Sequence, residues 1–362
     1  MKNTFGTSVA VTLFGESHGE YIGAVIDGLA PGIGIDRGYI DRMLTLRRPV
    51  GKISTARREQ DAWRIVSGVL DGKTTGTPIT LLIPNEDVRS GDYAGIRTVP
   101  RPSHADYAAQ CKYHGFQDPR GGGHFSGRIT AALVAAGAIC RCALERKGIL
   151  IGTHVLSCAG IRDRGFEDPV SDIRALNGKP FAVLDEARGE EMRAAIGVAA
   201  SEGDSVGGIL ETMVIGMPEG VGEPWFDTVE GQLAHMMFSI PGVKGIEFGA
   251  GFAIADMKGS EANDPFRMEG GRVVTATNNS GGINGGITNG MPILFRTAVK
   301  PTPTVLKPQA TVDLSSMTDT VLEPTGRHDP AIVHRARTVQ DAATAIVLCD
   351  ALALRFGTDW LR

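Results

Sequence analysis

The sequence predicts an α+β fold built on antiparallel sheets, and two observations carry that prediction. Short β-like runs bounded by Gly, Pro or Asp alternate with a few helical stretches, without the regular strand–helix–strand order of a parallel sheet. The dipeptide Asp71-Gly72 lies between the runs 63–69 and 77–83. It is a strong hairpin signal, because a type I′ turn needs positive φ at both central residues.

The elements follow from where apolar runs begin and end. The expected strands are 9–14, 23–26, 63–69, 77–83, 149–156, 208–215, 251–256 and 292–299. The expected helices are 37–46, 128–147, 186–200, 226–239 and 339–356. The second helix is rich in Ala and carries its larger apolar residues near the 3.6-residue period. The chain shows neither an internal repeat nor a long linker.

Composition excludes several classes of protein. Lys and Arg number 37 and Asp and Glu 41, so the net charge of −4 does not suit a nucleic-acid partner. The five Cys form no C-x-x-C and predict reduced thiols, with neither a disulfide framework nor a metal site. The first residues lack a signal-peptide pattern, and no uninterrupted stretch of about 18 apolar residues occurs. We therefore expect a cytoplasmic protein without a membrane partner.

Two familiar motifs fail on their context. Residues 15–19 match the G-x-S-x-G nucleophile elbow, but only 14 residues precede them and a β-like run follows. Residues 67–74 approach a Walker A loop, but they lie in the centre of the predicted hairpin, where no helix can receive a phosphate. Hydrolase and nucleotide-binding folds are therefore not supported.

Two His-bearing segments are candidates for proton transfer. His18 lies between small residues at the end of an expected strand, and His104 lies in 101–106, where Asp106 could orient it or stabilise its charge. An imidazole with an ordinary pKa of ~6.5 suits proton transfer near neutrality. A solvated surface turn is an equally good interpretation of either segment taken alone.

Gly-rich segments and paired cations predict an anion site. Gly accounts for 48 of 362 residues, and the excess concentrates in 121–127 and 281–290. Three consecutive Gly before the Ala-rich helix would bring backbone and a helix N-terminus to an anion, although a flexible loop is the alternative. Arg47 and Arg48 could bind a phosphate or carboxylate, although a solvated helix end is again possible. Together these features predict an enzyme acting on a multiply anionic small molecule, with or without a phosphorylated cofactor.

Ten short segments occur in order along the chain: 14–19, 47–49, 57–59, 101–106, 120–123, 202–205, 243–245, 281–283, 300–302 and 326–330. Together they resemble the chorismate synthase family. Two positions depart from the usual pattern of that family: Ser103 stands where Gly is usual, and Ala331 where Cys is common.

The resemblance implies a sandwich of antiparallel four-stranded sheets and helices, one domain over residues 1–362, and a homotetramer. It implies a carbon–oxygen lyase of the shikimate pathway, which serves aromatic amino acid biosynthesis. The reaction is the anti-1,4-elimination of phosphate from 5-enolpyruvylshikimate 3-phosphate to give chorismate. It requires reduced FMN (FMNH2) without net redox change, and NADPH is a candidate reductant. An NADPH-dependent FMN reductase and a phosphometabolite-binding protein are the alternatives.

The resemblance also implies roles by position. His18 would protonate the departing phosphate, His104 would stabilise or protonate the reduced flavin, and Asp329 would assist deprotonation at flavin N5. Which His serves which group stays open. The implied substrate-binding residues are Arg47, Arg48, Arg101 and Arg327. The implied flavin-binding residues are His124, Phe125, Ser126, Pro241, Gly242, Gly285, Lys300, Pro301, Thr302, Pro303, Thr304 and Arg327. The implied NADP-associated residues are Arg47 and Lys52.

Overall fold

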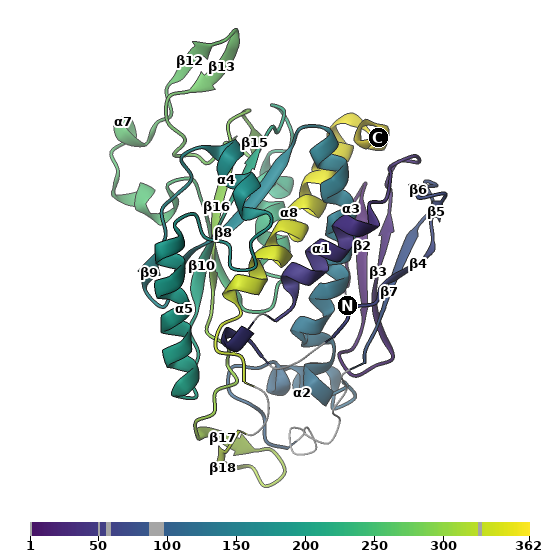
Figure 1. Cartoon of the computed structure of the whole chain (residues 1–362), viewed down its shortest axis with the longest axis vertical. Helices are drawn as coiled ribbons and strands as arrows, with labels where there is room; N and C mark the ends of the chain where they lie inside the picture. Colours follow the sequence, from purple (N-terminus) through teal and green to yellow (C-terminus); the bar gives the residue numbers. More distant parts are fainter. Residues whose placement is uncertain (1, 50, 56–58, 87–97, 325–327) are drawn as a thin grey trace.

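A layer of helices lies between two antiparallel sheets in the computed structural model (Figure 1). The structure describes residues 2–49, 51–55, 59–86, 98–324 and 328–362. The α+β class with antiparallel sheets is as predicted. Each main sheet has five strands in the described residues, where the resemblance implied four. One edge strand in each, β1 and β9, is only two residues long, so four longer strands form the body of each sheet.

The first sheet has the order β1-β2-β3-β7-β4. In β7 every second side chain is buried, which is the pattern of a sheet with one face on the core. The short strands β5 and β6 close the predicted hairpin, and Asp71 and Gly72 both have positive φ, 49° and 73°. The strand bounds are β1 Thr4–Phe5, β2 Ala10–Gly15, β3 Tyr21–Asp27, β4 Arg64–Ser67, β5 Val69–Leu70, β6 Lys73–Thr74 and β7 Ile79–Pro84.

The second sheet has the order β11-β16-β10-β8-β9. Its register aligns a charged row across four strands, in which Glu211 lies opposite His154 on one side and Arg296 on the other, and Arg296 lies opposite Glu247. Hydrogen bonds join these neighbours along the row. The strand bounds are β8 Leu150–Cys158, β9 Ile161–Arg162, β10 Gly208–Ile215, β11 Val243–Phe248 and β16 Ile293–Val299.

The helical layer consists of α1 (Arg37–Arg47), α3 (Thr130–Arg146) and α8 (Val333–Phe356). The crossing of α3 and α8 is close, because a Cβ on Gly137 would lie 2.5 Å from the Ala342 carbonyl oxygen. Small side chains therefore set how near the two helices approach.

One segment among the described helices, Gly127–Arg146, could span a membrane by length and composition, with a mean hydropathy of 1.5. Of its most apolar window, 83% is buried inside the protein, and Arg141 interrupts it. It is the core helix of the layer.

Several predicted boundaries need correction. The strand expected at 251–256 is wrong, because Gly251–Asp256 forms a 3-10 helix; Gly249 and Gly251, with φ of 57° and 63°, turn the chain out of the sheet. Helix α8 begins at Val333, six residues before the predicted start, and the Ala-rich helix begins at Thr130 after a 3-10 turn. Helix α6 is shorter than predicted, because Thr228 caps its start.

The remaining elements surround the layer. Figure 1 shows the β12–β13 hairpin with α7 extending from one end of the molecule and the β17–β18 hairpin from the other. Their bounds are α2 Asp106–Tyr113, α4 Pro169–Leu176, α5 Glu186–Ser201, α6 Val229–Met237, α7 Gly259–Ala262, β12 Phe266–Glu269, β13 Arg272–Thr275, β14 Ile283–Asn284, β15 Ile287–Thr288, β17 Gln309–Asp313 and β18 Thr318–Leu322.

Candidate active site

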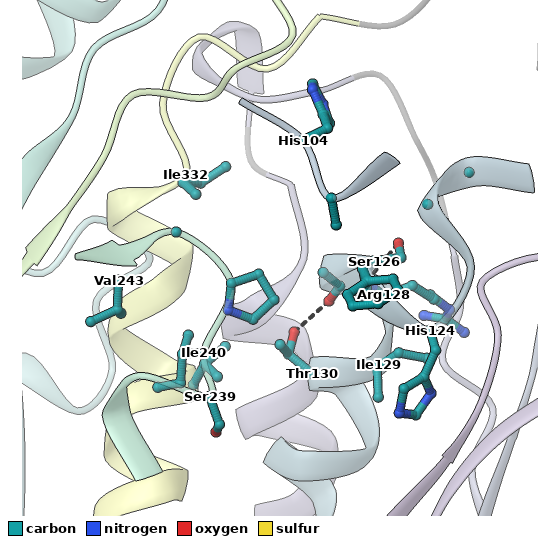
Figure 2. A pocket seen from close by; sticks show the side chains of 18 of the residues that line it. His104, His124, Ser126, Arg128, Ile129, Thr130, Ser239, Ile240, Val243 and Ile332 are labelled. Carbon is teal, nitrogen blue, oxygen red and sulfur yellow. Dashed lines mark hydrogen bonds between the residues drawn. The ribbon is translucent and has the colours of Figure 1, made fainter. Parts of the chain in front are cut away.

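A cavity of about 940 Å³ opens where loops from both sheets meet the starts of α3 and α8. That volume is at the upper end of the range for small-molecule sites, roughly 300–1,000 Å³. Figure 2 shows its side chains arriving from different elements: Thr130 from α3, Ser239 and Ile240 from the segment after α6, and Ile332 from the start of α8, with His104 at the far end of the view.

A buried carboxylate organises three arginines at one wall. The Asp61 side chain is 0% exposed, and its Oδ1 pairs with Arg128 Nη1. Its Oδ2 lies 3.5 Å from Arg48 Nε and 3.9 Å from Arg47 Nη1. Asp61 has a φ of 51°, a conformation that costs a non-glycine residue energy and therefore marks a site held by its surroundings.

Arg47 also braces the start of α3. Its Nε donates to Thr130 Oγ1 at 2.9 Å, and its Nη2 donates to the Gly127 carbonyl oxygen at 2.8 Å. Arg48 is more exposed and donates from Nη2 to the Gln60 carbonyl oxygen. Of the predicted pair, Arg48 is therefore the cation with more freedom to meet an anion.

The triple-glycine loop lies over His18. Gly121, Gly122 and Gly123 all have positive φ, and the Ser17 N–H donates to the Gly123 carbonyl oxygen at 3.1 Å. A Cβ on Gly121 would lie 2.2 Å from His18 Cε1, so only glycine allows this approach. His18 is buried behind the loop and is not among the residues that line the cavity.

The loop does not run directly into the Ala-rich helix, as the sequence analysis expected. It forms 3-10 turns over Arg120–Phe125 and Gly127–Ile129, and Ser126 caps the second turn by accepting from the Arg128 N–H at 3.2 Å. Bare backbone still faces the cavity at Gly122, whose Cβ would meet only Ser126 Cβ at 3.9 Å.

The surroundings of His104 favour its neutral form. Its Nδ1 donates to the Pro102 carbonyl oxygen at 3.0 Å, which leaves Nε2 to accept from Thr304 Oγ1 at 3.0 Å. Burial and the neighbouring Arg101 guanidinium lower the pKa of His104 below its ordinary value of 6.5.

Asp106 does not orient this ring, because the ring nitrogens contact Pro102 and Thr304, but its negative charge acts to raise the pKa of His104, in line with the predicted charge stabilisation. Its carboxylate takes a bidentate contact from Arg101, at 2.8 and 2.9 Å. Burial alone would raise the pKa of Asp106, but the hydrogen bonds from Arg101 outweigh it and lower that pKa.

Asp329 forms a half-buried ion pair with Arg335, and both residues line the cavity. Burial lowers the pKa of Arg335 to about 10, so its guanidinium stays charged at neutral pH. Lys300 also lines the cavity, and its Nζ donates to the Ser103 carbonyl oxygen at 2.7 Å. Burial, and then the charge of Lys244, lower the pKa of Lys300. The cations described above, from five separate segments, therefore line one cavity: Arg47 with Arg48, Arg101, Arg128, Lys300 and Arg335.

The family model described as chorismate synthase matches residues 9–353. The chain belongs to the chorismate synthase family. A chorismate synthase of Aeropyrum pernix is 48% identical over 98% of this chain and 93% of the relative. One of Dehalococcoides mccartyi is 46% identical over 99% and 98%. A crystal structure of chorismate synthase superposes with a TM-score of 0.76 at 30% identity, covering 97% of this chain and 94% of the other.

The structure brings most of the residues implied by the chorismate synthase resemblance to the cavity. No group of three or more His, Cys, Asp or Glu in the described ranges could hold a metal ion. The implied residues that line the cavity are Arg47, Arg48, Arg101, His104, His124, Phe125, Ser126, Pro241, Gly242, Lys300, Pro303, Thr304 and Asp329.

Other implied residues do not line this cavity within one chain. Pro301 and Thr302 follow Lys300 but face elsewhere, and Gly285 lies at the turn between β14 and β15. Arg327 lies outside the described residues, and so does the side chain of Lys52.

Gly281 and Gly282 serve backbone packing in this chain, whereas a Cβ on Gly285 would meet nothing within 4 Å. A Cβ on Gly281 would lie 2.5 Å from Gly249 N, and one on Gly282 would lie 2.5 Å from the Pro292 carbonyl oxygen. Within one chain, residues 121–127 contribute to the lining of the cavity and residues 281–290 do not.

Sequence reasoning missed three residues of the site. Asp61 and Arg335 stand in no motif that signals a ligand, and Arg128 directly follows the glycine-rich segment 121–127. Their importance comes from the ion pairs that they make across the chain, such as Arg128 with Asp61. Charged residues of this kind become informative only when the fold buries them.

Proposed function

We propose that the protein is a carbon–oxygen lyase that converts 5-enolpyruvylshikimate 3-phosphate into chorismate and phosphate, by anti-1,4-elimination with reduced FMN and without net redox change. Two observations together carry this proposal: the chain belongs to the chorismate synthase family, and most of the residues implied by that family line one cavity rich in cations. We also propose a cytoplasmic location, as for a pathway enzyme acting on soluble metabolites.

The residues present fit FMN. The cavity offers bare backbone at Gly122 and Gly242, an apolar wall that includes Ile240 and Ile332, and a cation at Lys300. Such a combination suits a planar ring with a phosphate tail. His124, Phe125, Ser126, Pro241, Pro303 and Thr304 would hold it. When bound, reduced FMN supplies transient electron donation and an N5 position that receives the hydrogen lost from substrate C6.

The arginines would bind the substrate's phosphate and carboxylates. Arg48 and Arg101 present guanidinium groups that are already oriented, by Asp61 and Asp106 respectively. Guanidinium binds such oxyanions with bidentate geometry. Because these guanidinium groups are fixed before the substrate binds, they lose little orientational freedom on binding. They would hold the substrate beside the cofactor and away from water.

His104 is placed to manage a proton at the cofactor. As a neutral imidazole with Nδ1 committed to Pro102, it has Nε2 as its basic nitrogen. An anion bound nearby would raise its pKa and allow it to carry a proton. His18, beneath the glycine loop, would protonate the departing phosphate once the loop admits it, and Asp329 would accept a proton near N5.

NADPH is the proposed reductant. Arg47 is implied for it by position, but its guanidinium is already engaged with α3, and the side chain of Lys52 is not described. Reduction of FMN by a separate reductase therefore requires less of this chain than reduction by NADPH bound to the chain itself.

A second copy of the chain is the proposed partner, in a homotetramer. The arm formed by residues 251–277 exposes large apolar side chains, with Phe252 83%, Phe266 71% and Met268 69% exposed. Apolar groups clustered on a projecting hairpin indicate a surface covered in an assembly. Sedimentation of Phe266→Ser should show smaller species than the parent protein; an unchanged tetramer would reject the arm as the interface.

The test of function is anaerobic release of phosphate from 5-enolpyruvylshikimate 3-phosphate, with and without dithionite-reduced FMN. We expect many turnovers per reduced flavin and none with oxidised flavin alone. One product per reductant consumed would instead identify a reductase. Binding without turnover would identify a phosphometabolite-binding protein.

A further inference from the structure

Arg335 is a cavity residue to which neither the motifs nor the resemblance assign a role. It lies in the first turn of α8 and lines the cavity beside Asp329. Its Nη2 pairs with Asp329 Oδ2, and the two side chains are only 17% and 13% exposed. Because water screens such a pair poorly, each charge strongly constrains the orientation of the other.

The pair leaves two polar atoms without partners. Arg335 Nε and Asp329 Oδ1 are buried, and neither has a hydrogen-bond partner among the residues that the structure describes. Unsatisfied buried groups are costly and few in native proteins, so each requires an explanation. Here one atom is a donor and the other an acceptor, and both belong to one ion pair at a cavity wall. This combination indicates a ligand edge that carries a donor beside an acceptor.

We propose that Arg335 is the positioning residue of Asp329, and that together they present a donor and an acceptor to the ring edge of the bound flavin. The inference rests on the proposed function, because it takes FMN as the ligand. Asp329 Oδ1 would accept from the ring N–H, and Arg335 Nε would donate to the neighbouring carbonyl. Arg335 thereby prevents the carboxylate from rotating away.

Such a pair distinguishes the two redox forms of the ligand. Reduced flavin carries a proton at N5 beside its C4 carbonyl, whereas oxidised flavin has a lone pair at N5. A carboxylate held at this edge attracts the first and repels the second. The positive charge of Arg335 further favours the more electron-rich ring. Loss of Arg335 should therefore weaken the binding of reduced FMN more than that of oxidised FMN.

The test compares Arg335→Gln with the parent protein. Dissociation constants for oxidised and for dithionite-reduced FMN are measured anaerobically, together with the midpoint potential of the bound flavin. We expect the constant for reduced FMN to rise about tenfold, with that for oxidised FMN changed less than twofold. For a two-electron couple, a tenfold ratio lowers the potential by about 30 mV.

Two further variants separate positioning from a merely structural role. Arg335→Lys keeps the charge but loses the planar guanidinium, so the ratio of the dissociation constants for reduced and oxidised FMN should shift in the same direction by a smaller amount. This variant replaces the Gln variant in the test if the Gln variant does not fold. Arg337→Gln is the matched control. Arg337 lies two residues later in α8, is fully buried, pairs with Asp341 at 3.1 Å and does not line the cavity. The Arg337→Gln variant should be less stable than the parent protein, with the ratio of the two FMN dissociation constants unchanged.

The outcomes are distinct. The inference is overturned if the Arg335 variants bind oxidised and reduced FMN more weakly by the same factor, or if their flavin midpoint potential stays within 5 mV of the parent's. The proposed function still stands in that case, provided that the parent protein releases phosphate. If the Arg335 variants show the expected shift but the parent protein binds FMN and releases no phosphate, the inference about Arg335 and Asp329 is supported and the proposed function is rejected.

Discussion

Gly121→Ala should damage the protein more than the same change at the next residue. Both positions have positive φ, 58° and 85°, so alanine pays the same conformational cost at each, about 1–2 kcal/mol. At Gly121 the new Cβ would also lie 2.2 Å from His18 Cε1, 2.4 Å from His18 Nδ1 and 2.7 Å from Ser17 Oγ. Overpacking of this kind adds about 1–3 kcal/mol.

The expected loss in the free energy of unfolding is therefore about 2–5 kcal/mol for Gly121→Ala and about 1–2 kcal/mol for Gly122→Ala. Equilibrium urea unfolding, followed by circular dichroism, measures both. The second variant is the control, because its Cβ meets only Ser126 Cβ at 3.9 Å. Neither loss exceeds the total stability usual for a domain, about 5–15 kcal/mol.

A second measurement addresses His18 itself. A displacement of about 1 Å in a group that acts in a reaction can cost roughly 100-fold in rate. Gly121→Ala should therefore lower kcat at saturating substrate by up to about 100-fold. Equal stabilities of the two variants, within about 0.5 kcal/mol, would refute the contact between the loop and His18.

Three more predictions follow from particular contacts. Ser103→Gly should raise the free energy of unfolding by up to about 1 kcal/mol and preserve activity, because Ser103 has a φ of 60°; a lower urea midpoint would contradict this. Burial alone would lower the pKa of His154, but hydrogen bonds to Asp163 and Glu211 outweigh it and raise that pKa. The stability lost in His154→Gln should therefore be greatest below pH 6.5 and fall as pH rises through the raised pKa of His154. Urea unfolding at pH 5.5, 7 and 8.5 measures this loss. A loss that grows with pH would mean that the pKa of His154 is lowered, not raised. Gly137→Ala should cost about 1–3 kcal/mol in thermal unfolding, because its Cβ would meet Ala342; an unchanged Tm would mean that the helices separate freely.

Regular elements with a clear period were predictable from the sequence. The strand 208–215 and the helix beginning at Arg37 coincide with the structure, and Asp71-Gly72 forms the expected turn. The failures have local causes. The expected strand at 251–256 has apolar residues of the right kind, but flanking glycines with positive φ redirect the chain.

The candidate site was predictable in part, because short motifs carry the residues but not their partners. The 101–106 segment suggested that Asp106 orients His104 or stabilises its charge. In the structure Asp106 accepts hydrogen bonds from Arg101 and acts on His104 only through its charge. A carboxylate beside both an imidazole and a guanidinium forms the stronger bidentate contact with the guanidinium. That competition depends on rotamers and on burial, which the order of residues does not express.

Patterns of polarity and ordered motifs are local properties of the chain, so they were enough to predict the α+β class, the family and several of the segments that line the cavity. The tertiary structure alone decided which of these residues meet. Asp61 is 67 positions from Arg128, and its carboxylate is ordered by three arginines only when α1 and α3 pack together. Asp329 gains its partner only because α8 begins early enough to include Arg335. Electrostatic interactions depend on distance and on the exclusion of water, and both are set by the packing of segments remote in the chain.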